Sequence, residues 1–549
     1  MTDPDPVFHT RVRTALDREV DGILGEDAGR WRQMQHRRLA ERVKTLAAGW
    51  RLTGDPALLV PARELIGLLR GLQNPSGLFR GGDNVDSPPD SAFSVNDLAD
   101  AAQLLGDQQE DLADLLESMT PALVKGGVHT PNHRWELSAA LARLHRLDPR
   151  PELAARVEQW LAEGVDIEDG LWSERSPNYA AHVSNPSLLT IADVFDRPDL
   201  AAAVEQNLTA TLDLLLPDGT VETVLSRRQD QRWPVPLQPY LLPLRLLAVR
   251  RGRGDLAWAA GLALEQGIAS AGTAATALLL TPEVGRLLPP PQAPPAVRGR
   301  HFTAAGTLVA HGPARTAVVF GGSDHARHQR IRSGLANSPT FLRLYAGRAV
   351  LDSARLSRTF FGLGPFRSAG LTVDGDTAVL GEAVSAGYYQ PLSVTDRDDQ
   401  GRYTVGDDGR FSAAMDFAQR ASDRVTLTTG IRVTLTETGA DLDVDVSGAV
   451  VDWSLELAFR PGGTMSGAAA LGDDRWQLES GTATYRVAGD ALSVTVFESP
   501  ETPAEAAPGY HPGEEYEFLG GTDAIGGVRL YVTGKAPSRL RLRIAASVN

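Results

Sequence analysis

The stretch LLPPPQAPPAVRGR, residues 287–300, divides the chain into two parts with different hydrophobic periods. A cluster of prolines cannot donate the backbone hydrogen bonds of a helix or a sheet. Before this stretch apolar residues recur every three or four positions, and after it they alternate with polar residues. The stretch therefore predicts a linker at 287–300 between a domain at 1–286 and a second domain at 301–549.

The first part predicts helices. Segments such as GDPALLVPARELIGLLRGL (54–72) and RPDLAAAVEQNLTATLDLLL (197–216) carry leucine and alanine at helical spacing, with turns marked by Gly, Pro and Asp. About ten to twelve such segments follow one another with short connections, which is typical of stacked antiparallel pairs. No repeat of fixed length is evident, which disfavours a regular solenoid. We expect an α/α toroid, an incomplete barrel of helix pairs.

The second part predicts strands. Leucine and valine alternate with aspartate in DLDVDV (441–446), and leucine and isoleucine alternate with arginine in RLRLRI (539–544). This period of two is that of a half-buried antiparallel strand. Many short segments of this kind, separated by Gly, Asp and Asn turns, predict an antiparallel β-sandwich. A cleft between two such domains is the default place for a ligand.

Composition excludes several classes of protein. The chain has 549 residues, 42% of them hydrophobic and 22% charged, no cysteine, and a net charge of -15. These values are typical of soluble globular proteins, exclude cysteine chemistry and argue against general nucleic-acid binding. No apolar run resembles a signal peptide or a membrane span. We expect a cytoplasmic protein, or a secreted or periplasmic one if a leader has been removed.

The stretch TPNHRWELSAALARLHRL (130–147) predicts a helix with an unusual first turn. Thr130 and Pro131 are typical of an N-cap and a first helical position. Asn132 and His133 then fall in the first turn, where the helix dipole disfavours imidazolium and favours a neutral general base, and Glu136 follows His133 at i+3. The alternative is that these residues only cap the helix.

The stretch EDGLWSERSPNYAAHVSNPSLL (168–189) is rich in turn residues. Tyr179 could donate a proton, Trp172 could stack on a sugar ring, and His182 follows Tyr179 at i+3. A tyrosine packed with its hydroxyl satisfied is the alternative.

Arginines gather in two further places. Arg227, Arg228 and Gln229 lie in one loop, and residues 321–358 hold seven arginines and two histidines against two aspartates. Arginine binds carboxylate and sulfate groups through paired hydrogen bonds, so both segments, with Arg332 in the second, are candidates to bind an anionic substrate. His325 and His328 could also bind a structural divalent metal with Asp352. Near the middle of the second part, GYYQP (387–391) contains Tyr388 and Tyr389. Aromatic residues often pack across neighbouring strands, and such packing alone would explain both tyrosines.

Taken in order, NHRWE (132–136), DGLWSERSPNY (169–179) and GRAVLD (347–352) resemble the heparinase II/III-type polysaccharide lyases and the related α/α-toroid alginate lyases. The resemblance covers nearly the whole chain and implies an α/α toroid followed by an antiparallel β-sandwich. It also implies β-elimination at a uronic acid, a reaction that requires no cofactor.

The resemblance implies roles for individual residues. Asn132 would neutralise the uronate carboxylate, with Arg227 or an arginine of the second domain, while His133 and Tyr179 would serve as base and acid. Glu136 would be the acidic partner of the histidine, and His328 a further catalytic histidine. In some relatives a tyrosine of the second domain is the base, for which Tyr389 or Tyr388 is our candidate.

Other functions remain open at this point. A uronyl C5-epimerase removes the same proton, and a non-catalytic homologue would keep only glycan binding. A glycoside hydrolase would need two carboxylates, for which Glu136, Asp169 and Glu174 are the candidates. The uronate glycan, its sulfation and an endolytic or exolytic mode stay open. The oligomeric state is open as well, and a homo-oligomer is one option.

Overall fold

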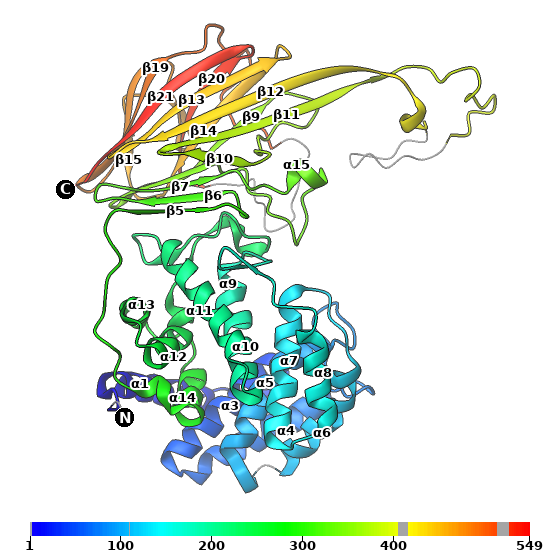
Figure 1. Cartoon of the computed structure of the whole chain (residues 1–549), viewed down its shortest axis with the longest axis vertical. Helices are drawn as coiled ribbons and strands as arrows, with labels where there is room; N and C mark the ends of the chain where they lie inside the picture. The colour runs from blue at the N-terminus through cyan, green and yellow to red at the C-terminus, as the bar shows by residue number, and fades with distance from the viewer. Residues whose placement is uncertain (1–2, 109, 404–414, 513–525, 549) are drawn as a thin grey trace. The chain divides into compact units, whose positions relative to one another are not determined.

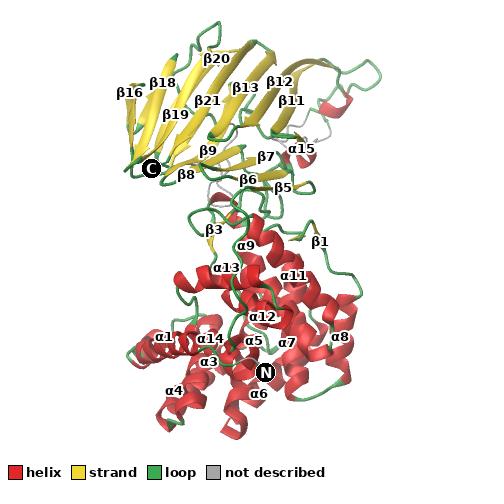
Figure 2. Ribbon diagram, turned by 60° about the vertical axis from the view of Figure 1, so that its left-hand side comes forward, coloured by secondary structure: helices red, strands yellow, loops and turns green. Residues whose placement is uncertain are grey.

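The computed structural model describes residues 3–108, 110–403, 415–512 and 526–548. The chain divides into two compact units (Figures 1 and 2). The helical unit comprises Met1–Leu215, Gly219–Val221 and Val235–Pro294, and the strand unit comprises Leu216–Asp218, Glu222–Pro234 and Pro295–Asn549. Residues 222–234 therefore belong to the strand unit, although helices precede and follow them in the sequence.

Helices of the helical unit alternate between an outer and an inner position. The inner helices are α3 (His36–Thr53), α5 (Pro88–Leu105), α7 (Pro131–Leu147), α10 (Asn185–Phe195), α12 (Leu241–Arg251) and α14 (Ala271–Leu280). The outer helices are α1 (Pro6–Leu24), α4 (Leu59–Leu72), α6 (Glu110–Lys125), α8 (Pro151–Leu161), α11 (Pro198–Asp213) and α13 (Gly254–Glu265). Neighbouring inner helices pack on one another from α3 to α12, and α14 packs back on α3. This arrangement is an α/α toroid.

The residue pattern explains which helices lie inside. Helix α5 is buried on most of its circumference and is rich in small residues such as Ser91, Ala99 and Ala102, so neighbouring helices can approach it closely. Outer helix α8 fully buries only one stripe, Leu153, Val157 and Leu161, and its other residues are partly or fully exposed. A helix with one apolar stripe has one packed face, whereas a helix buried all round needs neighbours on every side.

Two sheets form the strand unit. One has the order β10-β11-β12-β13-β21-β19-β18-β15 and the other β16-β17-β20-β14-β9-β8-β7-β6-β5. Among the described residues, the strand pairs are antiparallel except β17 with β20. The first sheet comprises β10 (Leu371–Asp374), β11 (Thr377–Tyr389), β12 (Ser422–Leu435), β13 (Gly439–Gly448), β15 (Thr464–Ser466), β18 (Gly481–Val487), β19 (Asp490–Glu498) and β21 (Ser538–Ser547). The second comprises β5 (Arg298–Phe302), β6 (Thr307–His311), β7 (Thr316–Phe320), β8 (Leu342–Ala346), β9 (Ala349–Arg358), β14 (Asp452–Phe459), β16 (Ala469–Gly472), β17 (Arg475–Gln477) and β20 (Val528–Lys535).

The two alternating segments of the sequence pair with each other. Strands β13 and β21 are antiparallel neighbours, with Leu442 opposite Leu542 and Asp443 opposite Arg541. The leucines are buried in the core between the sheets, and the Arg541 Nε lies 2.7 Å from Asp443 Oδ1 on the other face. The register thus places every apolar residue of both segments in the core and forms a ladder of aspartate and arginine outside.

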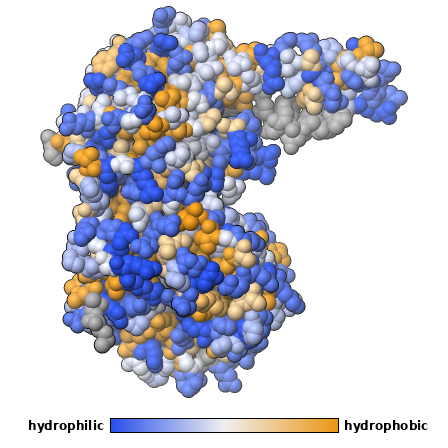
Figure 3. Space-filling view, in the orientation of Figure 1, coloured by the Kyte–Doolittle hydropathy of each residue, from blue (hydrophilic) through white to orange (hydrophobic). Residues whose placement is uncertain are grey.

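The fold class predicted from the sequence, an α/α toroid followed by an antiparallel β-sandwich, is confirmed. On the visible face of each unit, hydrophilic residues are interspersed with apolar ones (Figure 3). Among the described residues, each helix is too short or too polar to span a lipid bilayer.

Candidate active site in the helical unit

Helix α7 begins as the sequence predicts, at Pro131 after Thr130. The Thr130 side chain, however, makes no capping hydrogen bond, and the His133 backbone amide instead donates to the Thr130 carbonyl at 3.2 Å. Asn132 and His133 are buried, with exposed fractions of 1% and 8%. Two polar side chains are thus held inside the protein at the positive end of a helix dipole, where a neutral imidazole and a bound anion are favoured.

The His133 ring is packed among aromatic side chains and lies near a carboxylate. The rings of His129 and Phe93 meet it edge to face, with centroids 4.8 and 6.3 Å away. Asp90, on α5, is close enough for the charge on His133 to affect its titration. The position of Asp90 suits stabilisation of an imidazolium that forms when His133 accepts a proton.

Asp90 is held as a carboxylate by its surroundings. Burial alone would raise the pKa of Asp90, but hydrogen bonds from Ser87 and Asn84 and the charges of Arg37 and His133 outweigh burial and lower it. Sequence reasoning missed Asp90, because it lies 43 residues before His133 in a different helix and no local pattern connects them.

Asn132 connects α7 with the second motif. The Asn132 Nδ2 donates to Glu174 Oε2 at 2.5 Å, and Glu174 is buried. The Oδ1 of Asn132 has no hydrogen-bond partner among the described residues. The amide is therefore fixed by Glu174, and one of its two N–H groups remains for another acceptor.

Tyr179 lies at the end of a short helix, α9 (Pro177–Tyr179), that leads into a π-helical turn at Ala180–Ser184. The Ser176 Oγ accepts from the Tyr179 amide at 3.1 Å and starts this segment. Helix α7 packs against both the π-helical turn and α10. Single π turns are frequent at functional sites because they displace a side chain from the regular helical path.

Glu136 does not bond to His133. Its Oε1 accepts from Asn96 Nδ2 at 2.7 Å and its Oε2 accepts from Ser187 Oγ at 3.2 Å. Burial raises the pKa of Glu136 to about 7, although these two hydrogen bonds oppose the increase. The role implied by the resemblance, an acidic partner of the histidine, is thus corrected: Glu136 joins α7 to α5 and α10.

Trp172 also differs from its prediction. Its side chain is 5% exposed, and its indole nitrogen donates to Asn185 Oδ1 at 3.1 Å. Asn185 donates in turn to Asn207 Oδ1 at 2.9 Å, and Asn207 donates to the Gly170 carbonyl at 2.9 Å. Trp172 therefore holds the turn at residues 168–172 in place, and its ring is not a surface on which a sugar can stack.

The predicted arginine loop belongs to the strand unit. Arg227 forms a two-pronged ion pair with Asp324 at 2.9 and 3.1 Å, and Arg228 is buried, with its Nε 3.4 Å from Gln229 Oε1. Arg332 is exposed. Arg227 is thus already engaged by a carboxylate, so a substrate carboxylate would have to compete with Asp324.

The predicted metal site is not formed. His325 and His328 are the first and last residues of the short helix α15 (His325–His328), while Asp352 on β9 binds Arg460, with its Oδ1 2.9 Å from an Arg460 Nη. Within residues 3–108, 110–403, 415–512 and 526–548, no three His, Asp or Glu side chains are grouped to bind a metal. His325 is half-buried, and burial together with Arg367 lowers its pKa to about 4, so it is neutral. His328 is exposed.

Tyr388 and Tyr389 lie at the end of β11, where this strand pairs with β12. Their exposed fractions are 71% and 43%. The Tyr388 ring contacts Phe361, with centroids 5.7 Å apart, and the Tyr389 ring contacts Phe417 at 4.4 Å. Both hydroxyl-bearing side chains belong to the strand unit, whereas His133 and Tyr179 belong to the helical unit.

His182 borders a cavity of about 510 Å³ inside the helical unit. Phe93 and Glu136 also line this cavity. Desolvation lowers the pKa of His182, which favours its neutral form. The cavity thus adjoins the first turn of α7 and the π-helical turn, and it is of the size of a small-molecule site.

No family model and no curated protein matches the sequence. Solved structures do match. A heparinase III structure superimposes with a TM-score of 0.55 at 12% identity, over 92% of this chain and 76% of that chain. A structure of the heparan sulfate lyase HepC from Pedobacter heparinus has a TM-score of 0.48 at 12% identity, over 93% of this chain and 76% of that chain. The protein therefore has the fold of heparinase III, as the resemblance of its motifs implied.

Proposed function

We propose that this protein is a polysaccharide lyase that cleaves a uronate-containing glycan by β-elimination. The observation that carries the proposal is the hydrogen bond between Asn132 and Glu174. This contact joins the segment that holds His133 to the segment that holds Tyr179, in a chain with the heparinase III fold. An amide, an imidazole and a phenol are the groups that the reaction requires.

The chemistry begins at the uronate carboxylate. The remaining N–H of Asn132, in the first turn of α7, would donate to that carboxylate and stabilise the charge that develops on it. A base then removes the C5 proton, the C4–O bond breaks, and a C4–C5 double bond forms. The departing oxygen takes a proton from an acid.

We assign the base to His133 and the acid to Tyr179. Asp90 would stabilise the imidazolium that forms on His133, as a buried carboxylate does for a catalytic histidine. Tyr389 or Tyr388 is the alternative base, since each carries a phenol that is open to solvent. The substrate is proposed to be anionic, and heparan sulfate is the first glycan to test because HepC is described as a heparan sulfate lyase.

The test is to incubate the full chain with heparan sulfate, hyaluronan, alginate and glucuronan while recording ultraviolet absorbance. The new double bond is conjugated to the carboxylate, so elimination gives a rise in absorbance. We expect His133→Ala and Tyr179→Phe to abolish this rise and to retain oligosaccharide binding. Unchanged activity in both variants would refute the assignment.

The same experiment separates the alternatives. A C5-epimerase would exchange the C5 proton with deuterated solvent and give no absorbance change. A glycan-binding homologue would bind oligosaccharides, exchange no C5 proton and give no absorbance change. Two of the three carboxylates considered for a hydrolase already have hydrogen-bond partners. Glu136 bonds to Asn96 and Ser187, and Glu174 bonds to Asn132.

A further inference from the structure

A partly open cavity of about 510 Å³ lies among the six inner helices of the toroid, each of which contributes residues to its lining. Small-molecule sites in proteins have volumes of about 300 to 1,000 Å³. Its lining includes the apolar residues Phe93, Pro186 and Leu241, while Glu41, Asp97 and Gln238 bring hydrogen-bonding groups to the cavity. Apolar surfaces with a few polar groups are what the carbon and hydroxyl faces of a sugar require.

The cavity adjoins the candidate active site through neighbouring residues, while His133 and Tyr179 themselves do not line it. Phe93 lines it and is also the ring that meets His133 edge to face. Glu136, one turn after His133, and His182, three residues after Tyr179, line it as well. These three residues therefore connect the cavity to the segments that hold His133 and Tyr179.

Three inner helices give the cavity its depth. Lining residues are found seven positions apart on each: Arg37 and Lys44 on α3, Phe93 and Asp100 on α5, and Glu136 and Arg143 on α7. Seven residues of α-helix rise by about 10 Å. The cavity thus extends about two helical turns along the toroid from the level of the candidate active site.

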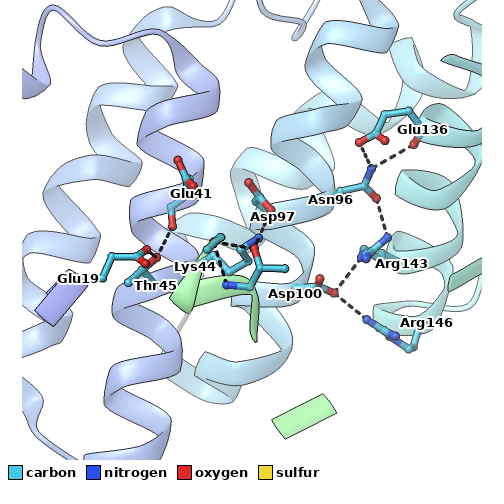
Figure 4. A network of polar contacts seen from close by, with 12 residues as sticks. Glu19, Glu41, Lys44, Thr45, Asn96, Asp97, Asp100, Glu136, Arg143 and Arg146 are labelled. Carbon is cyan, nitrogen blue, oxygen red and sulfur yellow. Dashed lines mark hydrogen bonds and ion pairs between the residues drawn. The ribbon is translucent and has the colours of Figure 1, made fainter. Parts of the chain in front are cut away.

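Ion pairs close the far end. The Arg143 Nε lies 2.9 Å from Asp100 Oδ1, and another Arg143 nitrogen donates to Asn96 Oδ1 at 2.9 Å (Figure 4). Lys44 pairs with Asp97 and donates to Thr273 Oγ1 at 2.8 Å. Lys44, Asp100 and Arg143 also line a second cavity of about 150 Å³. These paired charges therefore form a floor between the two cavities.

We propose that this cavity is a chain-end pocket, which receives the terminal saccharide of a uronate-containing glycan and ends at the floor formed by Lys44, Asp100 and Arg143. This inference rests on the proposed lyase function and specifies where along the glycan chain the enzyme cuts. Because the floor blocks further entry, elimination at His133 and Tyr179 releases one short product of fixed length. The enzyme acts from the end of the chain.

The first test follows product sizes by chromatography during digestion of the polymeric glycan that gives the largest absorbance rise. A single short product from the earliest time points supports the pocket. A broad ladder of fragments that shortens with time would overturn it, and would leave the lyase function intact.

The second test fills the pocket. Ala269 lines the cavity and is exposed, so Ala269→Trp adds a large ring with little risk to folding. Ile268→Trp, from the same loop, is a second filling variant. Glu265→Trp is the matched control, since Glu265 is exposed nearby on α13 and does not line the cavity. Thermal unfolding verifies that each variant is folded.

Binding of a heparan sulfate tetrasaccharide to the full chain is measured by calorimetry for each variant. We expect both filling variants to weaken binding by about tenfold or more, equivalent to about 1.4 kcal/mol, and the control to bind as the unmodified protein does. Equal binding by all four proteins, or no binding by any, overturns the pocket. Weakened binding in the filling variants without any absorbance change on the glycan panel would support the pocket and refute the lyase function.

Discussion

Asn132 and Glu174 are 42 residues apart in the sequence, and the amide of the first donates to the carboxylate of the second at 2.5 Å. Both are buried, so the hydrogen bond is shielded from water. Such a bond fixes the orientation of the amide plane, which in the proposed reaction decides whether an N–H group faces the uronate carboxylate.

Replacing Glu174 by alanine should therefore lower the elimination rate. Without its acceptor the Asn132 amide can rotate, and misplacement of a reacting group by about 1 Å can cost about a hundredfold in rate. We expect Glu174→Ala to reduce kcat by about that factor with a smaller effect on KM, measured by ultraviolet absorbance. Glu174→Gln keeps an acceptor oxygen and should retain more activity than the alanine variant. Equal activity of Glu174→Ala and the unmodified protein would contradict the role of this contact.

Glu136 should make stability depend on pH. Its folded-state pKa of about 7 lies above the ordinary glutamate value of 4.5, so its contribution to stability is fully present below pH 4.5 and is lost as the pH rises through about 7. A shift of this size corresponds to about 3 kcal/mol. Relative to Glu136→Gln, which cannot ionise, the unmodified protein should lose free energy of unfolding over this range, as measured in urea.

The control for this effect is Glu64→Gln, which changes an exposed glutamate on α4. Its pH profile should follow that of the unmodified protein. Parallel profiles for Glu136→Gln and the unmodified protein would show that Glu136 titrates normally.

A buried ion pair in the strand unit should matter more than an exposed one. Arg358 Nη donates to Glu382 Oε2 at 2.7 Å, and the side chains are 0% and 6% exposed. Glu382→Ala would leave a buried guanidinium without its counter-charge, which costs about 3 to 5 kcal/mol. Urea unfolding should show a loss of this size.

The comparison is Asp443→Ala, which removes a carboxylate from the exposed ladder between β13 and β21. Water and salt screen that pair, so we expect little change in the free energy of unfolding and still less at high salt. Equal losses in the two variants would contradict the importance of burial.

Trp172→Phe tests the corrected role of this residue. The variant removes the indole N–H from Asn185 and leaves a buried amide oxygen unsatisfied, which costs about 1 to 3 kcal/mol. We expect a lower melting temperature with unchanged oligosaccharide affinity. Trp233→Phe, at a half-exposed position, should leave both quantities unchanged. A loss of affinity in Trp172→Phe without a loss of stability would restore the sugar-stacking role.

Local pattern was sufficient to predict much of the fold. The alternation around Leu442 and Leu542 reports which face of each strand is buried, because side chains of a strand alternate between two faces. Thr130 and Pro131 mark the start of α7 because proline suits the first helical position and interrupts later ones. Neither inference requires knowledge of distant residues.

The parts that could not be predicted depend on distant partners. Glu136 lies 40 residues from Asn96, and Asp352 lies 108 residues from Arg460, so the sequence near each acid gives no sign of what binds it. The aromatic ring of Trp172 suits stacking on a sugar, but Trp172 is buried and its indole nitrogen bonds to Asn185 on α10, a contact that its neighbours in the sequence do not reveal.

The placement of residues 222–234 has a consequence for anyone who wishes to express the units separately. The chain passes from one unit to the other after Leu215, Asp218, Val221, Pro234 and Pro294, so a single cut cannot separate the two units completely. A fragment beginning at Pro295 would lack Glu222, the buried carboxylate 2.8 Å from Arg343. Such a fragment would carry a buried cation without its partner carboxylate, and a protease that cuts before Pro295 would leave residues 216–218 and 222–234 of the strand unit on the helical piece.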